Sequence, residues 1–346
     1  PSRTATGRPI LGSDPHRAHA LPSLRYIVHL TGPGLDAIGC GEPAAPGISF
    51  GHNGTSAFCL TIFPMDQEDI YVYDTNPDDP EQYRYLDGWE RMRVVREMVP
   101  VKGAPDQEVV LKFTRHGPVV HETPGRAYAV RSVWFEPGSS AYSTSLAVMQ
   151  VKSVAEYEAA LRHWSAPSAN HIYADTAGDI AWFAVGHTPI RRNWDGLLPV
   201  PGDGRYEWQG FHPREALPSA VNPAKGFVAT ANEMNLPADY PIDARRIGFE
   251  WSEHSRTARI HQVLAAQPAH SLADSMALQT DTLSIPARRL APILASLADA
   301  EPDAAAGLAL LRGWNFHLAA DSAPAALHEV WWTKHLKPAL LDRIAP

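Results

Sequence analysis

Cysteine is scarce in this sequence: Cys40 and Cys59 are the two among 346 residues. Their number and spacing match no zinc-ligand pattern, so they either pair with each other or stay as free thiols. Long apolar runs are also missing, because no uninterrupted stretch approaches the roughly 20 residues that a membrane-spanning helix needs. These absences argue against a zinc module and against an integral membrane helix.

The chain has no excess of positive charge. Thirty Lys and Arg residues stand against 38 Asp and Glu residues, a formal net charge of −8, and no dense basic run is present. A nucleic-acid backbone would therefore find no bulk basic field to bind. The composition, 45% hydrophobic and 20% charged, is ordinary for a folded chain and excludes disorder as the main state.

Several ligand-binding motifs are missing as well. Neither the phosphate-binding G-x-x-x-x-G-K-[ST] pattern nor a strand-linked G-x-G-x-x-G pattern occurs, which disfavours nucleotide binding. The 16 histidines include no H-E-x-x-H motif. His116 and His121 flank a Gly-Pro pair and fit the ends of strands better than a zinc site.

What the first two thirds of the chain do contain is strand-forming sequence. Alternating, aromatic or β-branched runs predict strands at residues 25–30, 69–73 and 109–114. Residues 171–175 and 179–184 flank Thr176-Ala177-Gly178, which predicts a hairpin. Segment 197–211 is interrupted by Pro and Gly, and we expect its Trp208 and Phe211 to anchor it by packing.

Helical patterns are concentrated in the last third, with one helix predicted earlier. In that earlier helix, Ser153 and Glu156 form a capping-box pattern at the start, and the helix should run to about Trp164. From about Ser252 onward, helical spacing covers residues 256–266, a segment opening at Ser271, and residues 286–299, 303–313 and 323–342. Strands followed by helices predict an α+β fold. We expect one domain over residues 1–346, strand-rich over 1–250 and mainly helical over 251–346.

A possible catalytic serine lies in Gly47-Ile48-Ser49-Phe50-Gly51, which matches the G-x-S-x-G nucleophile elbow. In serine hydrolases that elbow joins a buried strand to a helix. Here a Pro-rich segment precedes the motif and the turn sequence Asn53-Gly54 follows it. A serine esterase that uses Ser49 is therefore a rival hypothesis with an unfavourable context.

Asp66, Glu68 and Asp69 form an acidic cluster where a loop meets a predicted strand. Such a cluster can be a solvated loop, but oxygen ligands at this spacing can also wrap a hard cation such as Ca²⁺. The spacing alone leaves both interpretations open.

A set of strings across the chain resembles the β chain of the penicillin acylase (penicillin amidase) family, whose members are N-terminal nucleophile hydrolases. The strings are residues 12–16, 51–54 followed by Asp66 and Asp69, 85–89, 101–103, 114–120, 170–175, 199–202, 226–232, and Arg256. They occur in the family's order over nearly the whole chain. The ordered set is much more specific than any single string.

The resemblance implies an αββα sandwich with additional helices in the C-terminal third. It also implies a precursor whose cleavage makes a serine the first residue of the β chain, where the serine's own α-amine activates its hydroxyl and an acyl-enzyme forms. Aligning Asp14-Pro15-His16 with the family places this serine about seven residues before Pro1. Ser2 is therefore not a candidate. The chain is expected to be a β-chain fragment that is inactive alone and that pairs with an α chain from the same precursor in the periplasm or outside the cell.

The same resemblance assigns roles to individual residues. The Asn232 side-chain amide and the Ile62 backbone N–H would form the oxyanion hole. His16 would lie beside the nucleophile, and Arg256 would orient the asparagine or the substrate. The residues assigned to the acyl pocket are Phe50, Ala169 and Arg17, the last standing where the family often has an apolar side chain.

The resemblance also implies a structural Ca²⁺ ion. Its ligands would be the side chains of Asp66, Asp69 and Asp243 and the carbonyls of Glu68 and Gly196, with a further carboxylate from the α chain.

The sequence therefore predicts a hydrolase that cleaves the linear amide bond of an N-acyl amine. The substrate could be a penicillin-type antibiotic, an N-acyl homoserine lactone or a related compound, and the sequence does not choose among them. The rival to any enzyme is an acylase-like binding protein without catalysis.

Overall fold

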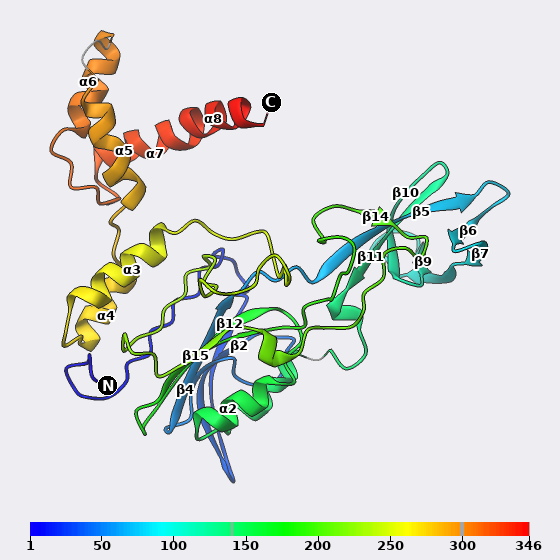
Figure 1. Ribbon diagram of the computed structural model, residues 1–346, viewed down its shortest axis with the longest axis horizontal. Coiled ribbons are helices and arrows are strands. Elements are labelled where there is room, and N and C mark those ends of the chain that lie inside the picture. Colours follow the sequence, from blue (N-terminus) through cyan, green and yellow to red (C-terminus); the bar gives the residue numbers. More distant parts are fainter. Residues whose placement is uncertain (140, 298–300, 346) are drawn as a thin grey trace. The chain divides into compact units, whose positions relative to one another are not determined.

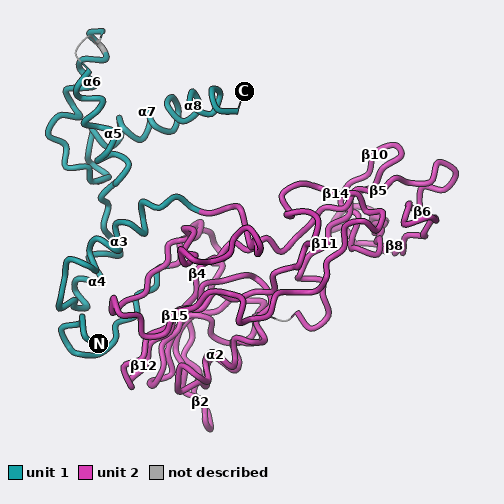
Figure 2. Tube along the Cα trace, viewed as in Figure 1, with its two compact units in different colours: residues 1–14, 252–346 teal, residues 15–251 magenta. Residues whose placement is uncertain are grey.

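The structure is a computed structural model that describes residues 1–139, 141–297 and 301–345. The chain divides into two compact units (Figure 2). Unit 1 consists of residues 1–14 and 252–346, and unit 2 of residues 15–251. The boundary near residue 251 coincides with the expected change from strands to helices. The expectation of one domain over residues 1–346 stays a prediction.

Unit 2 contains a seven-stranded antiparallel sheet (Figure 1). In spatial order its strands are β1 (Tyr26–Gly32), β2 (Leu35–Gly41), β3 (Phe50–His52), β4 (Ser56–Ile62), β12 (Ala169–Asp175), β13 (Ile180–Val185) and β15 (Ser219–Val221). The expected hairpin is confirmed, because β12 and β13 pair from Ala169↔Val185 to Ala174↔Ile180. The fourth strand, β4, lies directly beside β12, with Ile62 opposite Ala169.

An eight-stranded sheet forms the rest of the strand-rich part of unit 2 (Figure 1). Its strands are β5 (Glu68–Asn76), β6 (Asp79–Tyr85), β7 (Gly88–Arg91), β8 (Arg93–Val99), β9 (Gln107–Thr114), β10 (Gly117–Thr123), β11 (Arg126–Ser132) and β14 (Val200–Pro201). The order is β7-β6-β5-β11-β10-β9-β8, and β14 pairs in parallel with β5. The chain crosses from the first sheet to the second through residues 63–67, between β4 and β5.

His116 lies in the turn between β9 and β10, at the core of the second sheet. Its ring stacks on Tyr71 with centroids 3.8 Å apart, and its Nδ1 is hydrogen-bonded to the Tyr73 hydroxyl. Its Nε2 lies 2.9 Å from a carboxylate oxygen of Glu207. Burial acts to raise the pKa of Glu207, but its hydrogen bond with His116 and its other polar contacts outweigh burial, so the pKa of Glu207 is lowered. The expectation that His116 lies at the end of a strand is confirmed.

The helix α2 (Val154–Leu161) packs on strands β12 and β13 of the first sheet (Figure 1). It begins as expected, because the Ser153 side chain accepts a hydrogen bond from the Glu156 backbone N–H. It ends at Leu161, earlier than the expected Trp164. The remaining short helices of unit 2 are η1 (Val133–Phe135), η2 (Ala141–Thr144), α1 (Ser145–Val148) and η3 (Arg214–Ala216).

Unit 1 is helical, as expected. Its helices are α3 (Ser255–Ala266), α4 (Leu272–Gln279), α5 (Ile285–Ala295), α6 (Pro302–Leu311), α7 (Ala323–Trp331), η4 (Trp332–Leu336) and α8 (Lys337–Ile344). Ser271 caps α4 in a complete capping box with Asp274. The helix expected over 286–299 ends at Ala295, and its predicted positions 298 and 299 lie outside the described residues. The α+β prediction is confirmed.

Across the described ranges, none of the helices has both the length and the apolar character needed to cross a membrane.

Candidate active site

The two residues expected to form an oxyanion hole meet at the end of β4. The Asn232 side-chain Nδ2 donates a hydrogen bond of 3.0 Å to the backbone carbonyl of Ile62. Ile62 is 47% exposed, and Ala169 lies opposite it on β12. Three of the predicted site residues, which span 170 positions of the sequence, therefore lie together where strand β4 ends and strand β12 begins.

Asn232 is held in an unusual backbone conformation. Its φ is +67°, in the left-handed region that asparagine tolerates better than most residues. The adjacent Ala231 backbone N–H donates to the Glu233 carboxylate at 2.7 Å, and Thr230 is hydrogen-bonded to Thr61 of β4 through their hydroxyls at 2.9 Å. The first contact lies within the Asn232 segment, and the second joins that segment to the end of β4.

Asn170, to which the sequence assigned no role, binds the end of β4 from the neighbouring strand β12. It is fully buried on β12, and its Nδ2 donates to the Ile62 carbonyl and to the Thr61 hydroxyl, both at 3.2 Å. Its Oδ1 accepts from Trp182 Nε1 at 2.7 Å and from Asn235 Nδ2 at 2.9 Å. Asn170 belongs to residues 170–175, one of the strings that carry the family resemblance, and this membership could have marked it as a site residue. Its buried amide positions the Ile62 carbonyl, to which Asn232 also binds.

The other predicted site residues lie in different settings. His16 and Arg17 are exposed in a segment outside regular secondary structure. Phe50 is buried on β3, with the Arg25 guanidinium 4.5 Å from its ring centroid. Arg256 is exposed in the first turn of α3, in unit 1. The roles proposed for these residues stay predictions.

Ser49 lies immediately before β3 rather than between a strand and a helix. Gly39 and Gly51 face each other there, and a Cβ on Gly39 would lie 1.9 Å from the Phe50 carbonyl, so the neighbouring strands approach too closely for a side chain. Ser49 is 5% exposed, and its hydroxyl contacts the Glu42 carboxylate at 3.4 Å and the Ser145 hydroxyl at 3.3 Å. These contacts do not build the base-activated elbow that an esterase requires. Cys40 and Cys59 are not joined by a disulfide.

The acidic cluster surrounds an arginine. Arg191 Nε donates to Asp69 Oδ2 at 2.7 Å, and Arg191 Nη2 lies 3.3 Å from Asp66 Oδ2. The same nitrogen contacts the backbone carbonyls of Asp66 at 3.3 Å and Glu68 at 3.4 Å. Burial raises the pKa of Asp66 to about 6, an effect that Arg191 opposes and Asp69 reinforces.

The fit of these residues to calcium can be tested by the donors they already meet. Calcium takes six to eight oxygen ligands at about 2.3–2.6 Å. Here both oxygens of Asp69 accept N–H donors, and Gly196 backs the guanidinium, since a Cβ on it would lie 2.8 Å from Arg191 Cζ. Asp243 is exposed. Within the described ranges, no three His, Cys, Asp or Glu side chains are grouped to hold a metal. The described arrangement therefore does not fit the ion, and calcium binding stays a prediction.

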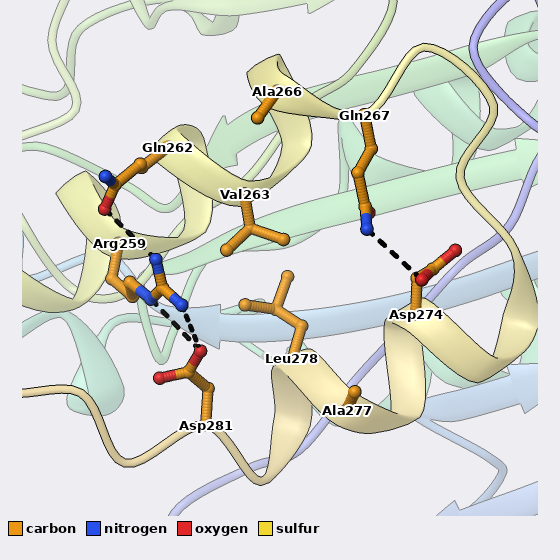
Figure 3. Close-up of a pocket in the computed structure, with 9 residues that line it drawn as sticks. All are labelled: Arg259, Gln262, Val263, Ala266, Gln267, Asp274, Ala277, Leu278 and Asp281. Atoms are coloured by element: carbon orange, nitrogen blue, oxygen red, sulfur yellow. Dashed lines mark hydrogen bonds and ion pairs between the residues drawn. The ribbon is translucent and has the colours of Figure 1, made fainter. Parts of the chain in front are cut away.

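A pocket inside unit 1 lies between α3 and α4 (Figure 3). Figure 3 shows Arg259 paired with Asp281 and Gln267 paired with Asp274. The Arg259–Asp281 ion pair measures 2.5 Å, and Gln267 Nε2 donates to Asp274 at 3.2 Å. Its polar groups thus bind one another, and we assign it no ligand.

Comparison with known proteins decides the family. The Penicillin amidase family model matches residues 1–345. The chain belongs to the penicillin amidase family. The resemblance deduced from the sequence is therefore confirmed over its whole extent.

Relatives carry two kinds of acylase name. The chain is 35% identical to "Penicillin acylase 2 proenzyme" of Pseudomonas sp. (strain SE83), over 82% of this chain and 37% of that protein. It is 26% identical to "Acyl-homoserine lactone acylase QuiP" of Pseudomonas aeruginosa, over 100% of this chain and 44% of that protein. It is 29% identical to "Penicillin G acylase" of Escherichia coli, over 77% of this chain and 32% of that protein. The chain thus spans less than half the length of these curated relatives.

A solved structure confirms the fold class. The thermostable penicillin G acylase from Alcaligenes faecalis matches with a TM-score of 0.81 and 25% identity, covering 94% of this chain and 60% of that one. The fold is that of the N-terminal nucleophile hydrolases, with antiparallel sheets and helices.

Proposed function

We propose that the complete protein hydrolyses the linear amide bond of an N-acyl amine through an acyl-enzyme on an N-terminal serine upstream of this chain. The observation that carries the proposal is the contact between Asn232 and Ile62 at the end of β4, in a member of the penicillin amidase family. The acylase names of its relatives support the substrate class.

The chemistry follows from the charge that develops during the reaction. Attack on an amide carbonyl creates a tetrahedral intermediate whose oxygen carries a negative charge that the substrate lacks. Donors aimed at that oxygen stabilise the transition state, and losing one typically costs a few kcal/mol. An amide nitrogen carries two hydrogens, so anchoring Asn232 through one of them on the Ile62 carbonyl is compatible with donation to the oxyanion by the other.

The assembly is part of the same proposal. An α chain from the same precursor would complete the acyl pocket, of which Phe50, Ala169 and Arg17 would form part. His16 would lie beside the nucleophile, and Arg256 would orient Asn232 or the substrate. The resemblance supports a periplasmic or secreted location. Penicillin-type compounds and N-acyl homoserine lactones are both candidate substrates, because relatives are named for each.

The test uses the complete, processed protein. Intact mass and N-terminal sequencing first establish that a serine begins the β chain, and release of free amine is then followed with penicillin G and with an N-acyl homoserine lactone. We expect turnover with at least one of them. In Asn232→Ala, kcat should fall on the order of a hundredfold with a smaller change in KM, because the lost donor acts on the transition state.

Asn222→Ala is the matched control. Asn222 also has a left-handed backbone, with φ +48°, but it binds Asp179 and the Ile180 backbone N–H at the far end of β13. It therefore reproduces the backbone strain without touching Ile62. Near-normal kcat in processed Asn232→Ala would reject the assigned role. Loss of activity in Ser49→Ala would favour the esterase, and a processed protein with no turnover would favour a binding protein.

A further inference from the structure

The oxygens that the family resemblance gives to calcium surround the guanidinium of Arg191. We propose that Arg191 is a permanent cation of the protein itself, which does the structural work of calcium here and makes stability independent of that ion. The proposal concerns how unit 2 is held together and goes beyond the proposed function.

The contacts of Arg191 cover most of the expected ligand set. Its Nε reaches the Asp69 side chain at 2.7 Å, and its Nη2 reaches the Asp66 side chain at 3.3 Å and the Glu68 carbonyl at 3.4 Å. Gly196 lies against the guanidinium, since a Cβ there would lie 2.2 Å from Asp66 Oδ2 and 2.8 Å from Arg191 Cζ. Four of the five residues expected to bind calcium are thus gathered around this side chain.

The burial of Arg191 and Asp69 distinguishes their ion pair from a solvent-exposed surface salt bridge. The exposed fraction of the side chain is 3% for Arg191 and 1% for Asp69. An arginine is always charged in a protein, so a buried one requires a counter-ion. Asp69 supplies it, and Trp194 Nε1 at 3.2 Å and Trp208 Nε1 at 2.5 Å donate to the same carboxylate. With Arg191, these donors take three of the roughly four acceptor sites of the Asp69 carboxylate, and both of those on Oδ2.

The arrangement joins three distant segments. Asp69 lies at the start of β5 and Asp66 in the crossing segment just before it. The loop after β13 supplies Arg191 and Trp194, and Trp208 comes from the Pro/Gly-rich segment beyond β14. A calcium site at this point would clamp the same loop to the same strand. Arg191 joins this loop to this strand with a cation that is part of the chain itself.

The experiment measures thermal unfolding of the complete protein in the presence of EDTA and in the presence of excess CaCl₂. We expect the wild-type Tm to be the same in both, and calcium in the dialysed protein to be substoichiometric by elemental analysis. Arg191→Met should lower Tm on the order of 10 °C, because it leaves buried carboxylates without their cation. Arg192→Met is the matched control, since its neighbour Arg192 is exposed, and its Tm should not change.

Added calcium distinguishes the remaining outcomes. In Arg191→Met the freed oxygens should admit Ca²⁺, so CaCl₂ should restore part of the lost Tm in that variant alone. A wild-type Tm that falls on chelation, or stoichiometric calcium in the wild type, would overturn the proposal. So would an Arg191→Met protein as stable as the wild type. If that variant does not fold, the wild-type chelation and metal measurements still decide.

Discussion

Replacing Asn170 with alanine should destabilise unit 2 strongly. The loss of unfolding free energy follows from the hydrogen-bonding groups that would lose Asn170 as their partner. The Ile62 carbonyl keeps its bond from Asn232, and the Thr61 hydroxyl keeps its bond with Thr230. Trp182 Nε1 and Asn235 Nδ2, by contrast, lose the acceptor that the structure gives them at 2.7 and 2.9 Å.

A polar group left buried without a partner costs about 1–3 kcal/mol of unfolding free energy. Trp182 Nε1 is buried and incurs this cost, whereas the partly buried Asn235 amide incurs less, so the total is about 3 kcal/mol. For a unit of this size that corresponds to a Tm lower by roughly 10 °C. The measurement is thermal or urea unfolding of the complete protein. Asn193→Ala is the matched control, because Asn193 is exposed and makes one bond, to the Arg205 carbonyl at 2.9 Å. It should cost less than about 1 kcal/mol.

A double-mutant cycle tests the reasoning itself. Trp182→Phe removes one of the two orphaned donors before Asn170 is changed. Asn170→Ala should then cost about 2 kcal/mol less than it does in the wild type, a coupling energy of that size. A coupling energy near zero, or an Asn170→Ala protein whose Tm stays within about 2 °C of the wild type, would refute the account of this network.

Two further predictions concern buried charge. Burial and, to a smaller extent, the charge of Arg214 lower the pKa of His171 to about 3, so below the ordinary value of 6.5 the unfolded chain binds a proton that the folded chain refuses. Stability should therefore fall as pH drops from 6.5 toward 3, by about 3 kcal/mol at pH 4.5, and His171→Gln should show that much less acid destabilisation in urea titrations at pH 7 and 4.5; equal losses in both proteins would contradict this. Asp69→Asn should lower Tm equally with EDTA and with CaCl₂, because it removes the counter-ion of Arg191. Asp74→Asn on the same strand, where the side chain is 76% exposed, should not; a drop confined to calcium-containing buffer would oppose the prediction.

Local signals in the sequence predicted much of the fold. The capping of α2 by Ser153 and the hairpin across 176–178 depend on residues a few positions apart, and both are confirmed. Strands β6, β7 and β8, over residues 79–99, were not predicted individually. Their residues are largely half-buried or exposed, with a mixed apolar and charged pattern, so their pairing depends on neighbours elsewhere in the chain.

The candidate site could be predicted only through the family resemblance. Ile62 and Asn232 are separated by 170 positions, and no periodicity connects them. Arg191 had no signal at all: an arginine in a loop followed by Arg192 and Asn193 looks like a solvated surface. Its burial follows from tertiary contacts with Asp66 and Asp69, which are more than 120 positions earlier in the chain.

The left-handed backbone of Asn232 limits how this position can change over evolutionary time. Glycine adopts such a φ without strain, asparagine and aspartate tolerate it, and β-branched residues are nearly excluded. Of these, asparagine alone combines the backbone shape with a neutral amide donor. Aspartate would keep the shape but bring a negative charge to the Ile62 carbonyl, and glycine would keep the shape with no donor. A descendant with glycine or aspartate here should therefore retain the fold but lose the proposed oxyanion donor. The residue at this single position would then indicate whether a related sequence retains that donor.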